Sequence, residues 1–247
     1  MNQAKVALRT FYRDHLKLDP AWTVFDEVIV KHRETLPVVL SQQEVQDLLA
    51  RLTEPRFHTY FSLLYSCGLR LGEALALEVG DISAKSLRIH IRNGKGGKDR
   101  YVPISPAMIQ RLRHWWLFHR HPRLIFPTLG RAWRAHQRAS KVSERQAQAL
   151  AMKQAEQPMS DSTVHNALKW AVIESGINKR ITPHTLRHCY ATHLLDAGVS
   201  LRYISNYLGH ASLNQTLVYA HLSAVGEQRT QEVLQGLDES VIRRSKG

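Results

Sequence analysis

The fold is decided by one stretch, Thr182–Leu222, which reads TPHTLRHCYATHLLDAGVSLRYISNYLGHASLNQTLVYAHL. The pair Thr182–Pro183 is typical of a helix start, because threonine caps the free N–H groups and proline suits the first helical position. Gly198 is typical of the end of that helix. Ser200–Gly209 then predicts a second short helix, and Ser212 begins a third that carries a tyrosine.

Several side chains in this stretch could act together on one substrate. His184, Arg187 and His188 share one helix face, since residues three and four apart are neighbours. His210 and Tyr219 follow on the next two predicted helices. Taken singly, each is more often an ordinary surface histidine or a packed tyrosine. Taken together, a guanidinium, imidazoles and a phenol suit an anionic phosphate and a nucleophile.

The order of these motifs resembles the tyrosine recombinase (phage integrase) family. HTLRH is followed by ATHLLDAG, by YLGH and by a tyrosine nine residues later. The match extends upstream through LPVVLS, YSCGLRLGEALAL and GKGGKDRYVPI, and covers most of the chain from Leu36 to Leu222. The resemblance implies a catalytic-domain fold that is mainly α with a small antiparallel β-sheet. It also implies cleavage and rejoining of DNA strands through a 3′-phosphotyrosyl intermediate.

The resemblance implies that two arginines hold the scissile phosphate. Arg70 and Arg187 would do so, because a guanidinium offers planar, permanently charged donors. Arg70 opens a predicted helix, where a cation meets the positive end of the helix dipole unless an anion is present. Glu73, three residues later, would hold the Arg70 guanidinium. An ordinary surface ion pair is the alternative for these two residues.

The other implied roles belong to the nucleophile and its helpers. Tyr219 would attack phosphorus, while His184 and His210 would donate hydrogen bonds to the phosphate oxygens. His184 is also the candidate base for the phenol, whose ordinary pKa of about 10 makes it a poor nucleophile at neutral pH. No metal or cofactor is implied, since the arginine pair supplies the positive charge.

Residues 86–105 carry the clearest strand pattern. Leu87–Ile91 and Tyr101–Ile104 alternate apolar and polar residues, and the turn NGKGGKD between them predicts a β-hairpin. In the family a lysine on this hairpin is a general acid. Lys95 is the better match because it stands between glycines, and Lys98 is the fallback.

The charge of the chain points to a polyanion as partner. Its formal net charge is +13 and its pI is near 10.0, which most simply indicates double-stranded DNA. Residues 110–145 hold nine Lys or Arg against one acid, interleaved with tryptophans. We expect DNA contacts from the basic residues Lys98, Arg100, Arg111, Arg131, Arg134 and Arg138.

The sequence predicts a small N-terminal part and one large domain. Residues 1–35 predict one helix and a linker, a remnant of the family's core-binding domain, because domains rarely fall below about 50 residues. Residues 36–247 are the expected catalytic domain. Within it, 130–158 is expected to be a basic insertion, either solvated or facing DNA. A helix over about 226–237 is expected to dock on a neighbouring protomer, giving a monomer in solution and a tetramer on paired DNA sites.

Composition and hydropathy indicate the cellular compartment. Cys67 and Cys189 lie in helical patterns and are typical of buried thiols in a reducing compartment. The sequence has no apolar run of membrane-spanning length and no secretory signal pattern. We therefore expect a bacterial protein of the cytoplasm, associated with the nucleoid and with no membrane partner.

Three alternative functions are open at this point. A zinc hydrolase could use His184 and His188, but the HExxH glutamate is missing and Arg187 would repel a cation. A non-catalytic DNA-binding remnant of a recombinase is possible, although all six residues of catalytic type are present. A type IB topoisomerase would use similar chemistry and would relax plasmids without exchanging strands.

Overall fold

The computed structural model describes residues 7, 10–17, 37–92, 94, 99–130, 133–140, 142–210 and 212–220. The chain divides into two compact units, Met1–Leu36 and Pro37–Gly247. The described part of the first unit contains a single turn of π-helix, η1 (Phe11–His15). All candidate site residues belong to the second unit.

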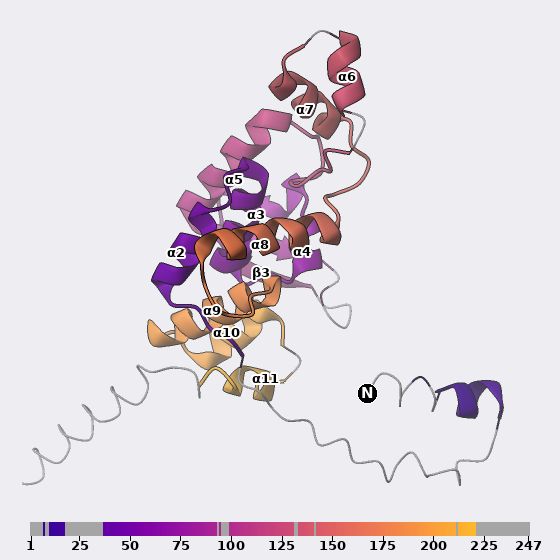
Figure 1. The fold of residues 1–247 in the computed structure, drawn as a ribbon. Helices are drawn as coiled ribbons and strands as arrows, with labels where there is room; N and C mark the ends of the chain where they lie inside the picture. The colour runs from indigo at the N-terminus through magenta and orange to yellow at the C-terminus, as the bar shows by residue number, and fades with distance from the viewer. Residues whose placement is uncertain are drawn as a thin grey trace, which may run out of the picture. The chain divides into compact units, whose positions relative to one another are not determined.

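The second unit is mainly helical, with a small antiparallel sheet, so the fold class expected from the sequence is confirmed (Figure 1). Its longer helices are α2 (Gln42–Ala50), α3 (Pro55–Cys67), α5 (Pro106–His119), α6 (Trp133–Ser140), α7 (Glu144–Lys153), α8 (Asp161–Ser175), α9 (Pro183–Asp196) and α10 (Leu201–Leu208). The short elements are α4 (Leu71–Leu75), η3 (Val79–Asp81), α11 (Asn214–Leu217), β1 (Ile82–Ser83), β2 (Arg88–Ile91) and β3 (Arg100–Pro103).

Helix ends follow the capping residues of the sequence. The Ser41 hydroxyl accepts from the backbone N–H of Glu44, and the Glu44 carboxylate accepts from the N–H of Ser41, which closes the predicted capping box. Gly68 and Gly209 end α3 and α10 with φ of 58° and 64°, a left-handed conformation that glycine adopts without strain. These two turns frame the candidate site.

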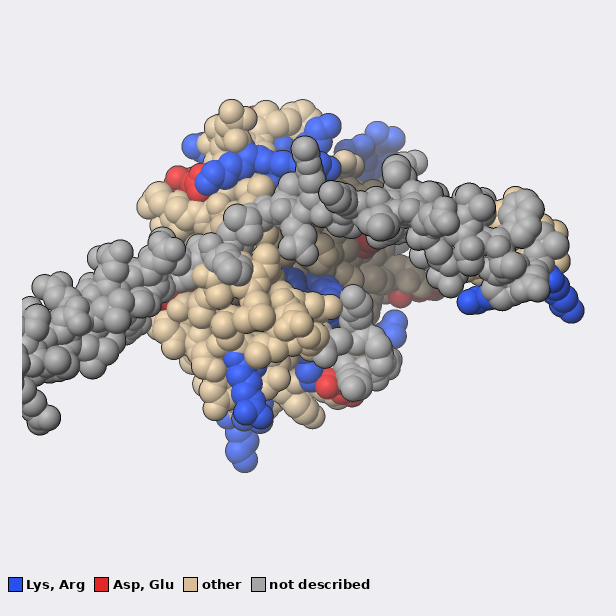
Figure 2. Space-filling view, turned by 90° about the horizontal axis from the view of Figure 1, so that it is seen from below, with Lys and Arg blue, Asp and Glu red and all other residues tan. Residues whose placement is uncertain are grey.

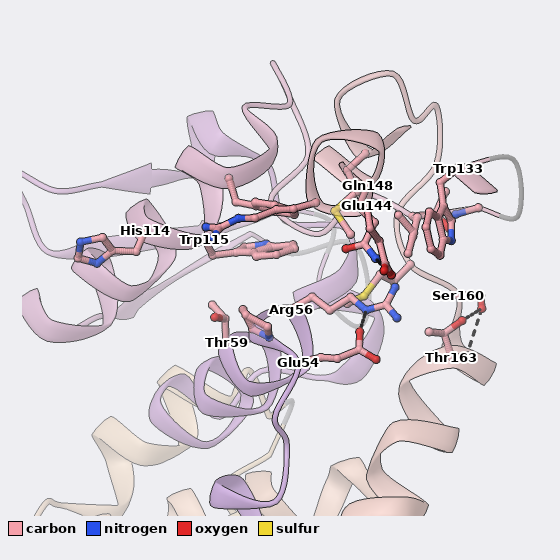
Figure 3. A pocket seen from close by; sticks show the side chains of 18 of the residues that line it. Glu54, Arg56, Thr59, His114, Trp115, Trp133, Glu144, Gln148, Ser160 and Thr163 are labelled. Atoms are coloured by element: carbon pink, nitrogen blue, oxygen red, sulfur yellow. Dashed lines mark hydrogen bonds and ion pairs between the residues drawn. The ribbon is translucent and has the colours of Figure 1, made fainter. Parts of the chain in front are cut away.

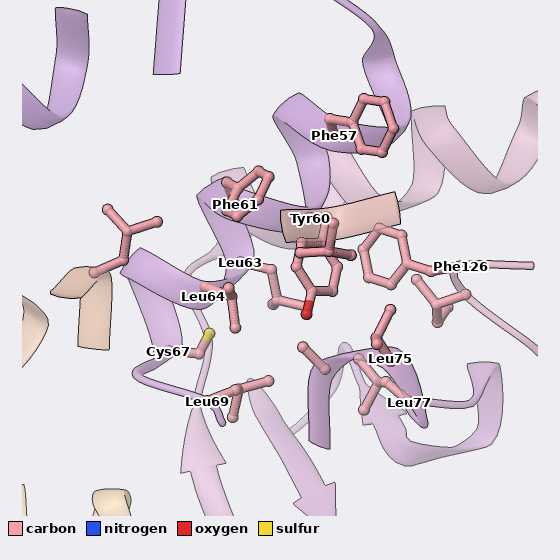
Figure 4. Packing of buried hydrophobic residues seen from close by; sticks show 14 of the residues in the cluster. Phe57, Tyr60, Phe61, Leu63, Leu64, Cys67, Leu69, Leu75, Leu77 and Phe126 are labelled. Carbon is pink, nitrogen blue, oxygen red and sulfur yellow. The ribbon is translucent and has the colours of Figure 1, made fainter. Parts of the chain in front are cut away.

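Helix α3 lies at the centre of the hydrophobic core (Figure 4). Tyr60 packs edge-on against Phe61 and Phe126, with ring centroids 5.3 and 5.2 Å apart. The Tyr60 hydroxyl donates to the carbonyl of Leu71 at 2.9 Å, so its buried polar atom is satisfied. Because α3 also packs against α9 and leads into α4, the core fixes the elements that carry both candidate arginines.

The predicted hairpin is present and is extended by a strand that the sequence did not reveal. β2 pairs with β3 in the register Ile89↔Val102, and both side chains are buried. β1 adds to the other edge of β2, giving the order β1-β2-β3. Leu87 breaks the expected alternation: it lies before β2 with φ of 51° and is 39% exposed.

The segment expected as an insertion, 130–158, contains α6 and α7. They lie at one end of the second unit, beside α5, whereas α9, α10 and α11 lie at the other end (Figure 1). Ser143 caps α7 through a capping box with Gln146, and Ala147 and Met152 are buried. The expected docking helix at 226–237 lies outside the described residues.

Candidate active site

Arg187 lies inside the protein on α9, with 3% of its surface exposed. Its guanidinium donates to the backbone carbonyls of Gly68 at 2.6 Å and Leu208 at 2.5 Å. These carbonyls stand at the C-terminal ends of α3 and α10, where the negative end of the helix dipole favours a cation. Burial lowers the pKa of Arg187 to about 10, with a further contribution from Arg70. The guanidinium therefore stays charged at neutral pH and is already fixed in place.

Arg70 precedes α4 and is held by Glu73, as the sequence predicted. The Arg70 backbone N–H and its Nη1 donate to the two carboxylate oxygens of Glu73 at 2.8 and 2.7 Å. Its Nη2 donates to the carbonyl of Gly209 at 3.0 Å. Both arginines are thus anchored to one turn, Leu208–Gly209, immediately before His210. Backbone carbonyls and one carboxylate bring together two cations that would otherwise repel each other.

Arg100 is largely buried, whereas the sequence indicated an exposed cation. We expected it to contact DNA, but its side chain is 9% exposed and forms a bidentate ion pair with Glu73, with both contacts at 2.7 Å. Its Nε also donates to the carbonyl of Tyr207 at 2.8 Å. Its three guanidinium nitrogens are therefore all engaged by groups of the protein itself. A Cβ at Gly209 would lie 2.8 Å from the Arg100 side chain, so this close approach requires glycine.

Glu73 is the negative centre between Arg70 and Arg100. Burial by itself raises the pKa of the Glu73 carboxyl, but hydrogen bonds from Arg100 and from Arg70 outweigh burial and lower it to about 2. The carboxylate is therefore ionised at any physiological pH. It links β3, α4 and the turn after α10 into one unit.

The rings of Tyr219 and His210 are nearly parallel. Their rings are stacked with centroids 6.4 Å apart, and His210 Nδ1 is 2.8 Å from the Thr216 hydroxyl. Tyr219 is 2% exposed and packs in a small apolar cluster with Ile204 and Leu208. It lies two residues beyond the end of α11, whereas the sequence predicted that this helix would carry it. Burial raises the pKa of the phenol, partly offset by Arg187.

His188 is the residue whose place in the site the sequence did not reveal. Its Nδ1 lies 2.9 Å from the Tyr219 hydroxyl, and the two ring centroids are 5.7 Å apart. His184, which we expected to serve the tyrosine, lies next to His188 with ring centroids 6.2 Å apart and faces the exposed side of α9. One sequence feature could have revealed this position: His188 shares a helix face with His184 and Arg187.

The three imidazoles are held in their neutral form. The pKa values of His188 and His210 are lowered to about 4, first by burial and then by neighbouring cationic or imidazole groups, among them Arg187. The pKa of His184 is lowered by partial burial and by Arg187 and Arg70. Neutral imidazoles can donate one hydrogen bond and accept another, so they can serve a phosphate without adding charge.

The hairpin lysines, Lys95 and Lys98, lie outside the described residues, as does Arg131. The strands that flank the loop are β2 and β3, and Ile91 pairs with Arg100 at its base. The buried ion pair of Arg100 with Glu73 therefore anchors the first residue of β3 beside Arg70.

The remaining expected DNA contacts are exposed side chains on α5 and α6. Arg111 donates to His58 Nδ1 at 2.6 Å, Arg134 lies over the Trp133 ring at 5.4 Å, and Arg138 is exposed on α6. Figure 2 shows Lys and Arg side chains in several groups on one face, with fewer Asp and Glu.

A groove of about 1490 Å³ lies where α3, α5, α7 and α8 meet (Figure 3). Its lining includes Arg56, Arg111, Arg134, Arg145 and Trp133. None of the described candidate catalytic residues lines it, so this groove and the candidate chemistry occupy different places.

The described part of the chain has neither a metal-ligand cluster nor a membrane-spanning helix. It contains no cluster of three or more His, Cys, Asp or Glu side chains arranged to hold a metal ion. No helix within those residues has both the length and the apolar character needed to cross a bilayer.

Comparison with known proteins places this geometry in a family. The model of the phage integrase family matches residues 38–225. The putative integrase/recombinase y4qK of Sinorhizobium fredii is 32% identical over 221 residues, covering 89% of this chain and 63% of that protein. Tyrosine recombinase XerD of Lacticaseibacillus casei is 33% identical over 227 residues, covering 88% of this chain and 70% of XerD. The chain thus spans about two thirds of the length of these relatives.

Solved structures agree with the sequence relatives. The XerA recombinase superposes with a TM-score of 0.62 at 27% identity, covering 93% of this chain and 74% of XerA. The XerH site-specific recombinase bound to its difH substrate has the same fold, with a TM-score of 0.60 at 22% identity and coverage of 81% and 53%. The fold and the gathered arginines, histidines and tyrosine define a tyrosine recombinase catalytic domain. The chain belongs to the phage integrase family, whose members here are tyrosine site-specific recombinases.

Proposed function

We propose that this chain cleaves and rejoins double-stranded DNA at a specific site through a covalent bond between Tyr219 and a 3′ phosphate. The observation that carries the proposal is the meeting of Arg70, Arg187 and His210 around one turn, with the Tyr219 ring stacked on His210. The relatives named above are described as integrase/recombinase or tyrosine recombinase, and the XerH site-specific recombinase is bound to its palindromic difH substrate, which supports a DNA site as the substrate.

The positive charges of this site offset the main obstacle to the reaction, which is the negative charge of the phosphodiester. A phosphodiester repels nucleophiles through its own negative charge. Arg70 and Arg187 are fixed before substrate arrives, so they stabilise charge that develops on the phosphate without reorganising; loss of one such donor typically costs about 3 kcal/mol of transition-state stabilisation. His184 and His210 would add neutral donors to the same oxygens. Tyr219 then attacks phosphorus, and the 5′ oxygen leaves.

The covalent step can be tested directly. The chain is incubated with nicked duplexes that tile the DNA flanking its own coding sequence, since a nick beside the cleavage site traps the cleaved complex. The expected result is a protein–DNA adduct that survives denaturing electrophoresis and disappears on protease treatment. Plasmid relaxation without strand exchange would instead indicate topoisomerase activity. DNA binding without an adduct on any duplex would indicate a non-catalytic remnant.

The leaving oxygen needs a proton, and we propose Lys95 as its donor. Lys95→Ala should lower the cleavage rate by roughly 10²–10⁴-fold, the usual contribution of a general acid. A 5′-phosphorothiolate duplex should restore the rate, because sulfur leaves without a proton. The adduct is measured in single-turnover time courses. Lys98→Ala is the matched variant, and rescue of that variant alone would assign the role to Lys98.

Exposed arginines are proposed to hold the DNA backbone. Arg111→Gln, Arg134→Gln and Arg138→Gln should each reduce the slope of log affinity against log salt by about 0.9 for each phosphate that the variant no longer neutralises. Affinity for the cleaved duplex is measured by fluorescence anisotropy across a salt series. Lys179→Gln is the control, because Glu44 already pairs with the Lys179 ammonium at 2.7 Å. An unchanged slope in all three arginine variants would place the DNA elsewhere.

The wider assembly also belongs to this proposal. We expect a monomer in solution and a homotetramer on paired DNA sites, joined through the helix expected at 226–237, in the bacterial cytoplasm beside the nucleoid. Light scattering of the free chain and of the chain on paired duplexes measures both states. A tetramer without DNA would contradict the proposed order of assembly.

A further inference from the structure

The hydroxyl of Tyr219 has one described hydrogen-bonding partner, and it is not among the six residues that the family resemblance supplied. His188 Nδ1 lies 2.9 Å from the phenolic oxygen. That separation is within the range for direct proton transfer between a nucleophile and a base. His188 is set one residue after Arg187 on the rigid helix α9, whose neighbouring side chains are buried. A helix positions a catalytic group more tightly than a loop does.

The surroundings of His188 keep its ring neutral, so that Nδ1 offers a lone pair to the Tyr219 hydroxyl. Charged or titratable side chains face it from its own helix, His184 and Arg187, and from the segments that follow α10, His210 and Tyr219. When Nδ1 accepts the phenolic hydrogen bond, the ring proton resides on Nε2. A DNA phosphate would neutralise Arg187 and Arg70 and so would raise the proton affinity of the nearby imidazole. Substrate binding itself would then activate the base.

We propose that His188 removes the proton of the Tyr219 hydroxyl during cleavage and returns it during rejoining, a step that rests on the proposed function. As the Tyr219 oxygen bonds to phosphorus, its proton passes to His188 Nδ1. The bond from phosphorus to the 5′ oxygen breaks, and that oxygen takes a proton from the general acid. In the reverse step the 5′ hydroxyl attacks phosphorus and returns its proton to the general acid, which the forward step left deprotonated. Tyr219 leaves and recovers its proton from the His188 imidazolium. Atoms and charge balance in both directions.

The first test replaces His188 with asparagine, whose amide lies where Nδ1 lay. The hydrogen bond to Tyr219 is retained, but the group no longer accepts a proton. Cleavage of the nicked duplex should fall by roughly 10²–10⁴-fold near neutral pH, and the deficit should shrink as pH rises because hydroxide can replace the base. The control is His165→Asn, an exposed histidine on α8, which should keep the wild-type rate and pH profile. Wild-type kinetics and an unchanged pH profile in His188→Asn would overturn the proposal.

Two further measurements separate a base from a structural support. His188→Ala opens space beside the tyrosine, and added imidazole should restore its cleavage rate in proportion to imidazole concentration. A folded His188→Ala variant that imidazole does not rescue would contradict the role, and thermal unfolding verifies the fold. The 5′-phosphorothiolate duplex should leave the His188→Asn defect in place, because that substrate relieves only the leaving group. Rescue by the phosphorothiolate would mean that His188 assists the leaving group and not Tyr219, and it would overturn the proposal.

The same experiments distinguish failure of this inference from failure of the proposed function. An adduct that persists in Tyr219→Phe would remove the tyrosine as nucleophile and the function with it. An adduct that needs Tyr219 but forms at full rate in His188→Asn would overturn only the role of His188.

Discussion

Tyr219→Phe is expected to form no covalent adduct with a nicked duplex while binding that duplex as the wild-type chain does. Only the hydroxyl is removed, so the ring still packs against Ile204 and Leu208 and still stacks on His210. The lost hydrogen bond to His188 should lower the free energy of unfolding by about 1 kcal/mol. The adduct is measured by denaturing electrophoresis, affinity by anisotropy and stability by urea denaturation.

The control for this prediction is Tyr203→Phe. Tyr203 is an exposed tyrosine on α10, 60% accessible, and removal of its hydroxyl should change neither adduct formation nor stability. If Tyr219→Phe keeps the wild-type level of adduct, another nucleophile is present and the assignment made from the motif spacing is wrong.

Local patterns in the sequence were enough to predict several helices and strands of the second unit. Alternation predicted β2 and β3, the Ser41–Glu44 capping box predicted the start of α2, and glycines marked the ends of α3 and α10. Each of these signals depends on residues within about four positions of one another, which is the range that backbone hydrogen bonds impose. The spacing of Arg70 and Glu73 belongs to the same class, and the structure confirms their contact.

Contacts between distant parts of the chain were beyond the reach of such patterns. Arg100 follows a glycine-rich loop and alternates with apolar residues, so the sequence indicated a surface cation. Its burial depends on Glu73, which is distant in sequence, and on the carbonyl of Tyr207 from a third segment. Likewise, nothing local to His188 indicates that the Tyr219 hydroxyl will lie against it. An arginine or histidine has the same local pattern whether its partner is water or a buried carboxylate.

The network around Glu73 has a consequence for stability as well as for chemistry. One carboxylate neutralises Arg100 through a bidentate pair and Arg70 through a single side-chain contact, and its side chain is 10% exposed. Removing one partner of a buried ion pair is more damaging than removing both, because it leaves an uncompensated buried charge. Here the loss of one negative charge would leave Arg70 and Arg100 beside each other, with Arg187 nearby, and no DNA to balance them.

Glu73→Gln is therefore expected to lower both the stability and the cleavage rate. The folded-state pKa of Glu73, about 2, lies below its ordinary value of 4.5, so the ionised carboxylate stabilises the fold above pH 4.5, and that contribution is lost as pH falls through about 2. A depression of this size corresponds to about 3 kcal/mol in the free energy of unfolding at neutral pH. The difference in free energy of unfolding between wild type and Glu73→Gln is measured by urea denaturation from about pH 7 to about pH 3. It should stay constant and then shrink below the ordinary pKa.

Glu156→Gln makes the same charge change at an exposed position and should change neither stability nor cleavage. A Glu73→Gln variant as stable as wild type at neutral pH would show that DNA-free Arg70 and Arg100 do not need the carboxylate, and the view of Glu73 as the centre of the site would have to be abandoned.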